Sequence, residues 1–145
     1  MDSVARIPRL AAQWKIIFDL KLTEHLDNAE GWWEVLNMWS DGDDVFSVYL
    51  QPKNIQLDID ARSQGISIKS EQLPKLFEWT RIEIGHEEKN NMYLITFSVG
   101  GKEMGRQEVY AEDLRKLEDV HLMIGSPTGD GCRGIARGLF VLEKQ

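Results

Sequence analysis

The sequence predicts an all-β protein in which two antiparallel sheets pack face to face. Apolar residues recur at every second position in most of its apolar segments, which is the period of a strand with one buried face. Short segments of this kind follow one another at hairpin spacing, with Gly, Asp and Asn between them. About ten or eleven such strands in a chain of this length are typical of a two-sheet sandwich.

The clearest alternation covers positions 14–22. One face of this segment is apolar and carries Trp14, Ile16, Phe18, Leu20 and Leu22. The other face carries Lys15, Asp19 and Lys21, so we expect an antiparallel strand with one side in water. The segment 32–39 follows a polar turn and is apolar on both faces. That pattern predicts a central strand, or a strand covered by a ligand or partner.

Shorter strands are expected along the rest of the chain. They lie at 45–50, 55–59, 66–70, 79–84, 92–99, 102–104, 120–124 and 135–142. Gly100 and Gly101 form a two-residue hairpin turn between two of these strands. Helix signals are scarce: positions 111–118 predict one or two turns, and positions 71–77 predict one.

Composition restricts the classes of function. The chain has 145 residues, with 17 Lys and Arg against 24 Asp and Glu, and a net charge of −7. We expect one domain over residues 1–145, and no nucleic-acid partner because an acidic chain does not attract phosphate backbones. Cys132 is the only cysteine, which excludes an internal disulfide framework. No apolar run approaches the roughly 20 residues that span a bilayer, so we expect no membrane insertion.

The first residues do not read as a signal peptide, because no apolar run follows them. The location stays open between the cytosol, export without a leader, and a mature secreted domain. Most enzyme signatures are missing: there is no Gly-rich phosphate loop, no Gly-x-Ser-x-Gly elbow and no His-Glu-x-x-His helix. We therefore expect no enzyme and no catalytic residues. Glu34, Asp58 and Asp60 are the carboxylates that a sandwich glycosidase would use, and a solvated face explains them as well.

An acidic segment lies between two of the expected strands. Asp41, Asp43 and Asp44 place three carboxylates within four residues. Oxygen-rich turns of this kind hold hard cations, so these residues are candidate metal ligands and Ca²⁺ is the expected ion. The alternative is a polar hairpin turn, because the full Asp-x-Asp-x-Asp-Gly…Glu pattern is missing. The loop 126–134 is a second candidate for binding, since long loops on rigid sandwiches often carry function.

Three of the five tryptophans lie in the segment 32–39. Strict alternation places Trp33, Asn37 and Trp39 on one face. The opposite face then holds Trp32, Leu36 and Met38, which form a suitable core set. A flat aromatic ring beside a hydrogen-bonding amide suits a sugar, so the first face is the candidate carbohydrate-binding site. The alternative is that Trp33 and Trp39 belong to the core and that Glu34 marks the open face.

Several phrases of the sequence resemble a known family. They are Pro8-Arg9-Leu10, Trp14-Lys15-Ile16-Ile17-Phe18-Asp19-Leu20-Lys21, Trp79-Thr80-Arg81-Ile82-Glu83-Ile84, and the ending Gly125-Ser126-Pro127…Gly134-Ile135-Ala136-Arg137-Gly138-Leu139. They resemble the concanavalin A-like jelly roll of galectin and laminin G type, and most of all small galactose-binding lectins of cnidarians. The resemblance implies a jelly-roll sandwich that binds galactose-like glycans. The sequence departs from the family at Asp43-Asp44-Val45-Phe46, where that family has Gly-Asp-Arg-x-Pro, and at Thr128, where it has tryptophan.

Three functions follow as hypotheses. The first is a non-enzymatic lectin for galactose-like glycans or glycoproteins, assisted by calcium and working as a homodimer, because multivalency converts weak single-sugar affinity into avidity. The second is a protein-interaction module of laminin G type. The third is a sandwich-fold glycosidase.

Overall fold

A computed structural model describes residues 3–24, 33–59, 66–90, 92–109, 117–124 and 134–143. These residues form eleven strands in two antiparallel sheets, which confirms the all-β sandwich. In chain order the strands are β1 (Ser3–Leu10), β2 (Trp14–Leu22), β3 (Trp33–Ser40), β4 (Asp43–Leu50), β5 (Ile55–Ile59), β6 (Ile66–Lys69), β7 (Trp79–Lys89), β8 (Met92–Val99), β9 (Lys102–Val109), β10 (Leu117–Ile124) and β11 (Gly134–Glu143).

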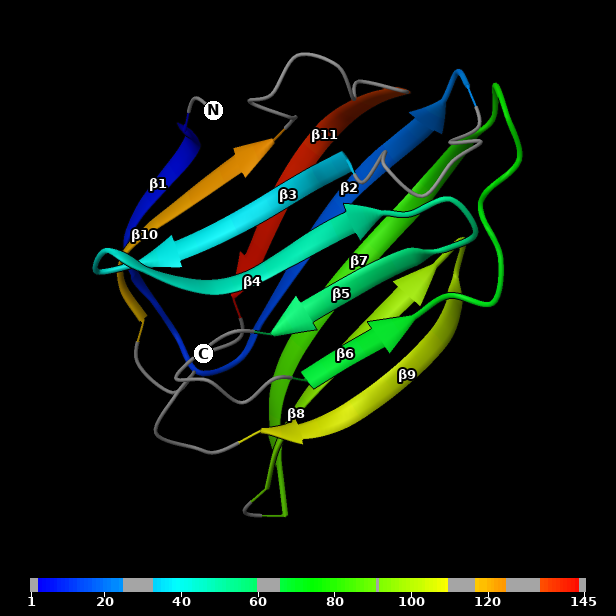
Figure 1. The fold of residues 1–145 in the computed structure, drawn as a ribbon. Coiled ribbons are helices and arrows are strands. Elements are labelled where there is room, and N and C mark those ends of the chain that lie inside the picture. Colours follow the sequence, from blue (N-terminus) through cyan, green and yellow to red (C-terminus); the bar gives the residue numbers. More distant parts are fainter. Residues whose placement is uncertain are drawn as a thin grey trace.

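The two sheets lie face to face as two layers (Figure 1). Sheet A has six strands in the order β1-β10-β3-β4-β5-β6, and sheet B has five in the order β11-β2-β7-β8-β9. Successive hairpins build most of each sheet, while β10 and β11 return from the far end of the chain to pair with β1 and β2. β3 and β4 are consequently the two central strands of sheet A.

The structure corrects several expected boundaries. β1 was not among the expected strands, since Pro8 and Arg9 interrupt its apolar pattern. β7 continues to Lys89 and β9 to Val109, well beyond the apolar part of each segment. No helix forms at 71–77, and residues 117 and 118 of the other expected helix begin β10, while 111–116 lie outside the described residues. The described residues hold no helix that is long and apolar enough to cross a membrane.

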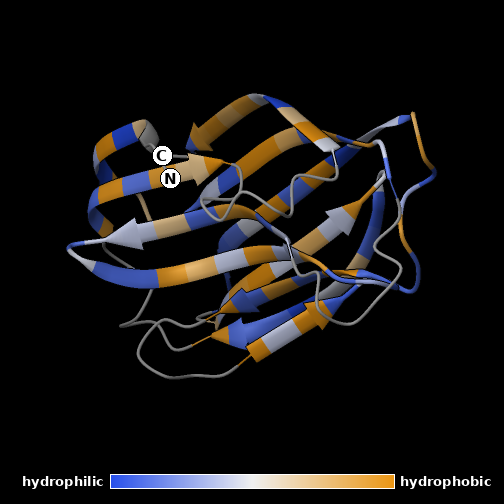
Figure 2. Cartoon of the chain, turned by 45° about the horizontal axis from the view of Figure 1, so that its top comes forward, coloured by the Kyte–Doolittle hydropathy of each residue, from blue (hydrophilic) through white to orange (hydrophobic). Residues whose placement is uncertain are grey.

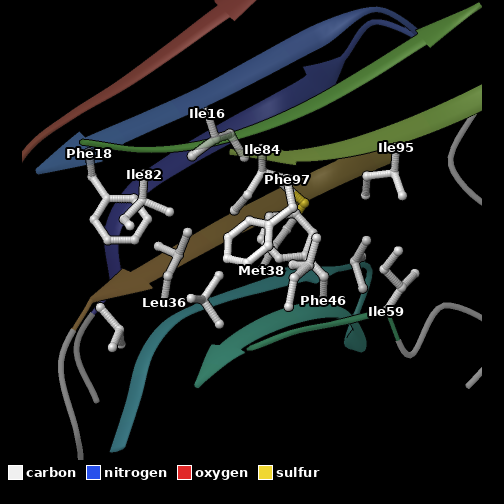
Figure 3. Close-up of a cluster of buried hydrophobic side chains, with 14 of the residues drawn as sticks. Ile16, Phe18, Leu36, Met38, Phe46, Ile59, Ile82, Ile84, Ile95 and Phe97 are labelled. Atoms are coloured by element: carbon white, nitrogen blue, oxygen red, sulfur yellow. The ribbon is translucent and has the colours of Figure 1, made fainter. Parts of the chain in front are cut away.

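The hydrophobic core fills the space between the sheets. Hydrophobic and hydrophilic residues alternate along the strands (Figure 2), so each sheet turns one apolar face inward. In β2 the predicted apolar face is buried at every position, Trp14, Ile16, Phe18, Leu20 and Leu22. Figure 3 shows side chains of β2, β7 and β8, such as Phe18, Ile84 and Phe97, facing Leu36, Met38 and Phe46 of sheet A. Burying each such side chain stabilises the fold by roughly 1.5–3 kcal/mol.

Four rings stack in a column within this core. Trp14 stands between Phe46 and His86, and Tyr93 stacks on the far side of His86, with ring centroids 5.9, 5.6 and 5.8 Å apart along the column. His86 is only 1% exposed, and its Nδ1 donates to the carbonyl oxygen of Ala12 at 2.5 Å. Because a carbonyl oxygen only accepts, Nδ1 carries a proton.

The burial of His86 makes stability depend on pH. Burial lowers the pKa of His86 below its ordinary 6.5, against the opposing effect of the bond to Ala12. The unfolded chain therefore takes up a proton near pH 6.5, whereas the folded chain takes it up only at lower pH. His86 leaves the free energy of unfolding unchanged above about pH 6.5. Below that pH the free energy of unfolding falls, until the pH reaches the lower pKa of His86 in the folded chain.

We expect the urea midpoint of the protein to decrease from about pH 7 to about pH 5. His86→Gln removes the buried titrating group and should flatten this decrease, whatever its effect on absolute stability. Gln107→Ala on β9 is the matched control, because it removes an exposed amide that does not titrate and should leave the slope unchanged. Equal slopes in the wild type and His86→Gln would contradict the assignment.

Candidate functional site

The candidate site lies on the outer face of sheet A, over its two central strands. Two β-bulges in the pairing of β3 with β4 decide which side chains reach it. Glu34 pairs with Tyr49 and Leu36 with Val48, which leaves Val35 as an extra residue in β3. A β-bulge of this kind reverses the alternation of faces, because it adds one residue to one strand only.

The first bulge overturns the predicted pairing of two tryptophans on one face. Trp33 lies before Val35, faces the core and is 1% exposed. Trp39 lies after it and is 43% exposed on the outer face. The prediction that Trp33 shares the binding face with Asn37 and Trp39 is therefore wrong for Trp33, while Asn37 and Trp39 do share the outer face.

A hollow of about 360 Å³ opens at this point of the outer face. Its walls come from three neighbouring strands: Glu34, Asn37 and Trp39 of β3, Asp44, Ser47 and Tyr49 of β4, and Met123 of β10. The register explains their proximity, since Asn37 stands opposite Ser47 on one side and Met123 on the other. The second bulge, at Val45, brings Asp44 opposite Trp39.

Asn37 is one of two buried side chains that line the hollow, the other being Ser47. Asn37 is 3% exposed, and its Nδ2 donates to Ser47 Oγ at 2.8 Å and to Asp44 Oδ1 at 3.2 Å. Because a carboxylate only accepts, these contacts place the amide nitrogen toward Asp44 and leave Oδ1 as the remaining acceptor. Among the described residues Asn37 Oδ1 has no hydrogen-bond partner. A buried acceptor without a partner costs about 1–3 kcal/mol, which a ligand hydroxyl or amine donated to it would recover.

Polar side chains continue from the hollow across β5 and β6. Ser47 stands opposite Asp58, and Asp58 opposite Ser67. Asp58 accepts a hydrogen bond from Ser67 Oγ at 2.7 Å and another from Gln56 Nε2. Gln56 in turn accepts from Gln51 Nε2 at 2.8 Å. The outer face of sheet A is therefore a strip of hydrogen-bonding groups with an aromatic side chain, Trp39, at the hollow.

The acidic turn does not gather its carboxylates. Asp41 and Gly42 have φ of +50° and +84°, the left-handed pair that a two-residue hairpin turn requires. Asp41 and Asp43 are exposed there, whereas Asp44 belongs to the hollow and contacts Asn37. No group of three His, Cys, Asp or Glu side chains in the described part of the chain could hold a metal ion. The three carboxylates therefore lie in a polar hairpin turn and do not converge on one point, and calcium binding by Asp41, Asp43 and Asp44 stays a prediction.

The remaining candidates are dispersed. Glu34 lines the hollow, while Asp58 is hydrogen-bonded two strands away and Asp60 lies outside the described residues. Cys132 and the loop 126–133 also lie outside them. Of the predicted carbohydrate-binding trio, the structure brings together Asn37 and Trp39, and it adds Ser47, Tyr49 and Met123, which the sequence reasoning missed.

Comparison with models of known protein families finds no match, and comparison with curated proteins finds none either. Solved structures do match. The receptor-binding domain of botulinum neurotoxin D is 14% identical, with a TM-score of 0.69 over 99% of this chain and 36% of that chain. A SAP-like pentraxin from Limulus polyphemus is 14% identical, with a TM-score of 0.62 over 96% of this chain and 67% of that chain.

An alginate lyase of polysaccharide lyase family 7 is also similar, at 13% identity and a TM-score of 0.60 over 94% of this chain and 62% of that chain. This chain spans about a third of the length of the neurotoxin domains that it matches. At these identities the likeness concerns the fold, and it confirms the jelly-roll β-sandwich. The likeness to cnidarian lectins stays a prediction.

Proposed function

We propose that this chain is a non-enzymatic binding protein that holds a galactose-like glycan on the outer face of sheet A. The buried Asn37 Oδ1 carries the proposal, because it is an acceptor without a partner among the described residues, on a side chain that lines the hollow. A sugar ring supplies hydroxyl donors on its edge and an apolar C–H face. Trp39 offers the matching aromatic surface at the wall of the same hollow.

Two further observations support a glycan. The strip of Ser47, Asp58, Ser67 and Gln56 extends the hydrogen-bonding surface beyond the hollow, as an oligosaccharide longer than one ring requires. Among the structural neighbours, the alginate lyases are named for a polysaccharide and the neurotoxin domains for receptor binding. A protein-interaction module of laminin G type is the alternative that a negative glycan screen would favour.

The proposal also includes a homodimer as the working unit and a role for calcium in binding the glycan. β11 is an edge strand of sheet B and exposes Ile135, Phe140 and Leu142. It therefore offers unpaired backbone groups and apolar side chains to a second copy. Two sites in one particle would raise the avidity for a multivalent glycan surface.

A glycan array tests the proposal. We expect the wild type to bind galactose-terminated glycans, and Asn37→Ala to reduce binding by roughly tenfold or more, since each lost hydrogen bond of this kind is worth about 1–3 kcal/mol. Gln107→Ala is the matched control, because it removes an exposed amide on β9 of the other sheet. Running the array with and without a chelator tests calcium assistance.

Two results would count against the proposal. Absence of binding to any glycan, with and without calcium, would contradict a lectin. Release of reducing ends from a bound oligosaccharide would contradict the non-enzymatic role, and would place Glu34 and Asp44, both at the hollow, as the acidic pair of a glycosidase.

A further inference from the structure

The outer face of sheet B lies on the opposite side of the sandwich from the hollow (Figure 1). The register of its five strands arranges the central side chains of this face in two parallel rows. In the strand order β11-β2-β7-β8-β9, the first row is Leu142, Lys15, Gly85, Thr96 and Arg106. In the same order, the second row is Phe140, Ile17, Glu83, Ser98 and Glu103. Every strand therefore contributes one residue to each row.

The first row has a gap in its middle. Gly85 carries no side chain there, and it lines a hollow of about 240 Å³. Lys15 stands beside it on one neighbouring strand and Thr96 on the other. A side chain at position 85 would collide with Thr96, whose Oγ1 lies 2.8 Å from the place of a Cβ. The hollow therefore has room for a side chain that comes from another molecule.

The two rows are complementary to each other. A two-fold axis that crosses the strands between the rows would place the first row of one copy opposite the second row of another, strand for strand. Glu83 of the second copy would then enter the hollow at Gly85, beside Lys15. At the end of the rows Leu142 would meet Phe140, and these side chains are 53% and 59% exposed in the single chain.

Opposite charges also meet across this axis. On β9, Arg106 of one copy comes opposite Glu103 of the other, and each chain already joins the two in an ion pair of 2.8 Å. On β7, Glu87 and Arg81 lie one step outside the two rows, one on either side. The axis brings Glu87 of one copy opposite Arg81 of the other. Positive groups that face negative groups are typical of a specific interface.

The face is also large enough for a dimer. Sheet B has five strands, each of eight residues or more. At about 4.8 Å between strands and about 3.3 Å per residue, the face measures roughly 24 by 26 Å. Two such faces together bury roughly 1,200 Å², which is the lower end of the range for specific protein interfaces.

Pairing of β11 with β11 of a second copy, edge to edge, is the other arrangement that the fold offers. The register of β11 with β2 shifts between Arg137 and Phe140, and Gly138 has a φ of +65° there. A bulge of this kind interrupts the straight row of backbone groups that edge pairing requires. The structure therefore favours contact through the face of sheet B.

We propose that two copies of this chain pack with the outer faces of their B sheets together, about a two-fold axis between the two rows. The inference specifies the homodimer of the proposed function and rests on that function for the role of the dimer. The two glycan-binding hollows of such a dimer face in opposite directions. The dimer therefore gains avidity by joining two glycan-bearing surfaces.

Charge reversal on β7 tests the arrangement. Glu87 and Arg81 are exposed and six residues apart on one strand, roughly 20 Å, so they do not contact each other within a chain. We expect the wild type to sediment as a dimer, at twice the 16.7 kDa of the chain. Glu87→Arg and Arg81→Glu should each raise the dissociation constant of the dimer by roughly tenfold or more, because each places like charges opposite each other twice.

Mixing the two variants distinguishes the interface from any effect within one chain. An equal mixture of Glu87→Arg and Arg81→Glu should recover the dimer, because each contact across the axis is again one Glu and one Arg. Lys69→Glu is the matched control, since it reverses an exposed charge on β6 of the other sheet and should leave the dimer intact. The melting temperature of each variant checks its fold.

Three results would overturn the inference. The first is a wild type that stays monomeric at every concentration measured. The second is a dimer that neither reversal weakens, which would assign the contact to the edge of β11, because β7 lies two strands away from that edge. The third is a pair of folded, monomeric variants that do not recombine when mixed, which would contradict the two-fold axis.

Glycan binding gives a separate readout. The monomeric variants should bind a galactose-terminated ligand like the wild type, because the hollow is on sheet A, but should no longer cross-link beads that carry this ligand. If no form of the protein binds a glycan, the proposed function is wrong and sedimentation still decides on the dimer. If the dimeric wild type binds glycan but cross-links no beads, the opposed arrangement of the two hollows is overturned.

Discussion

Trp39→Ala is expected to abolish glycan binding while the fold keeps nearly all of its stability. Trp39 is 43% exposed at the wall of the hollow, so its removal takes away the stacking surface and little of the core. Substitutions at such surface positions change the free energy of unfolding by less than about 1 kcal/mol. Titration of galactose-terminated ligand into the variant measures the binding loss, and chemical denaturation measures the stability.

The chain offers a close control for this experiment. Trp79 is 37% exposed on β7 of the other sheet, where Arg137 lies over its ring with 3.5 Å to the centroid. Trp79→Ala should lose a comparable amount of stability and no glycan binding. If Trp39→Ala binds glycan like the wild type, the hollow is not the binding site.

Trp33→Ala is expected to lose stability and to keep glycan binding, which is the opposite of the result expected for Trp39→Ala. Trp33 is 1% exposed and fills the core, and large-to-small changes of buried aromatic residues cost about 3–5 kcal/mol. In a chain of this size that loss corresponds to a decrease in melting temperature of roughly 6–20 °C. Calorimetry measures the shift, and the folded fraction should still bind glycan, because Trp33 does not touch the hollow.

A second substitution at position 33 checks that the loss of stability comes from the volume of the side chain. Trp33 Nε1 has no partner among the described residues, so its contribution comes from packed volume. Trp33→Phe keeps most of that volume and should lose much less stability than Trp33→Ala. Similar stability for Trp33→Ala and the wild type would place this ring outside the core and would invalidate the register at the Val35 bulge.

The sequence predicted the parts of the fold in which apolar residues alternate with polar ones along a strand without interruption. In β2, every residue of the predicted apolar face is buried, because β2 pairs with β7 in one continuous register and the bulge in its pairing with β11 adds the extra residue to β11. The same reasoning failed at β3. A bulge depends on how two strands pair, and no residue type in the segment 33–36 marks Val35 as the extra residue.

The candidate site was only partly predictable for a related reason. Asn37 and Trp39 lie on one strand and could be assigned to one face from their spacing. Ser47 and Tyr49 carried a usable signal, since they alternate with Phe46 and Val48 and therefore had to face outward. That they stand beside Asn37 depends on cross-strand register, which a single strand does not encode. Asp44 was assigned to a metal site because its neighbours in sequence are acidic, yet its hydrogen-bond partner is Asn37 across the hairpin.

The position of the hollow on the two central strands of sheet A has a consequence for how a ligand binds. The side chains that line it stand on paired strands, so the recognition groups are in place before the ligand arrives, and little entropy is lost in ordering them. Association should then proceed in one step, without a slow rearrangement. Ligands of different affinity should therefore differ in their residence time more than in their association rate. Discrimination by this face is therefore expected in the dissociation rate.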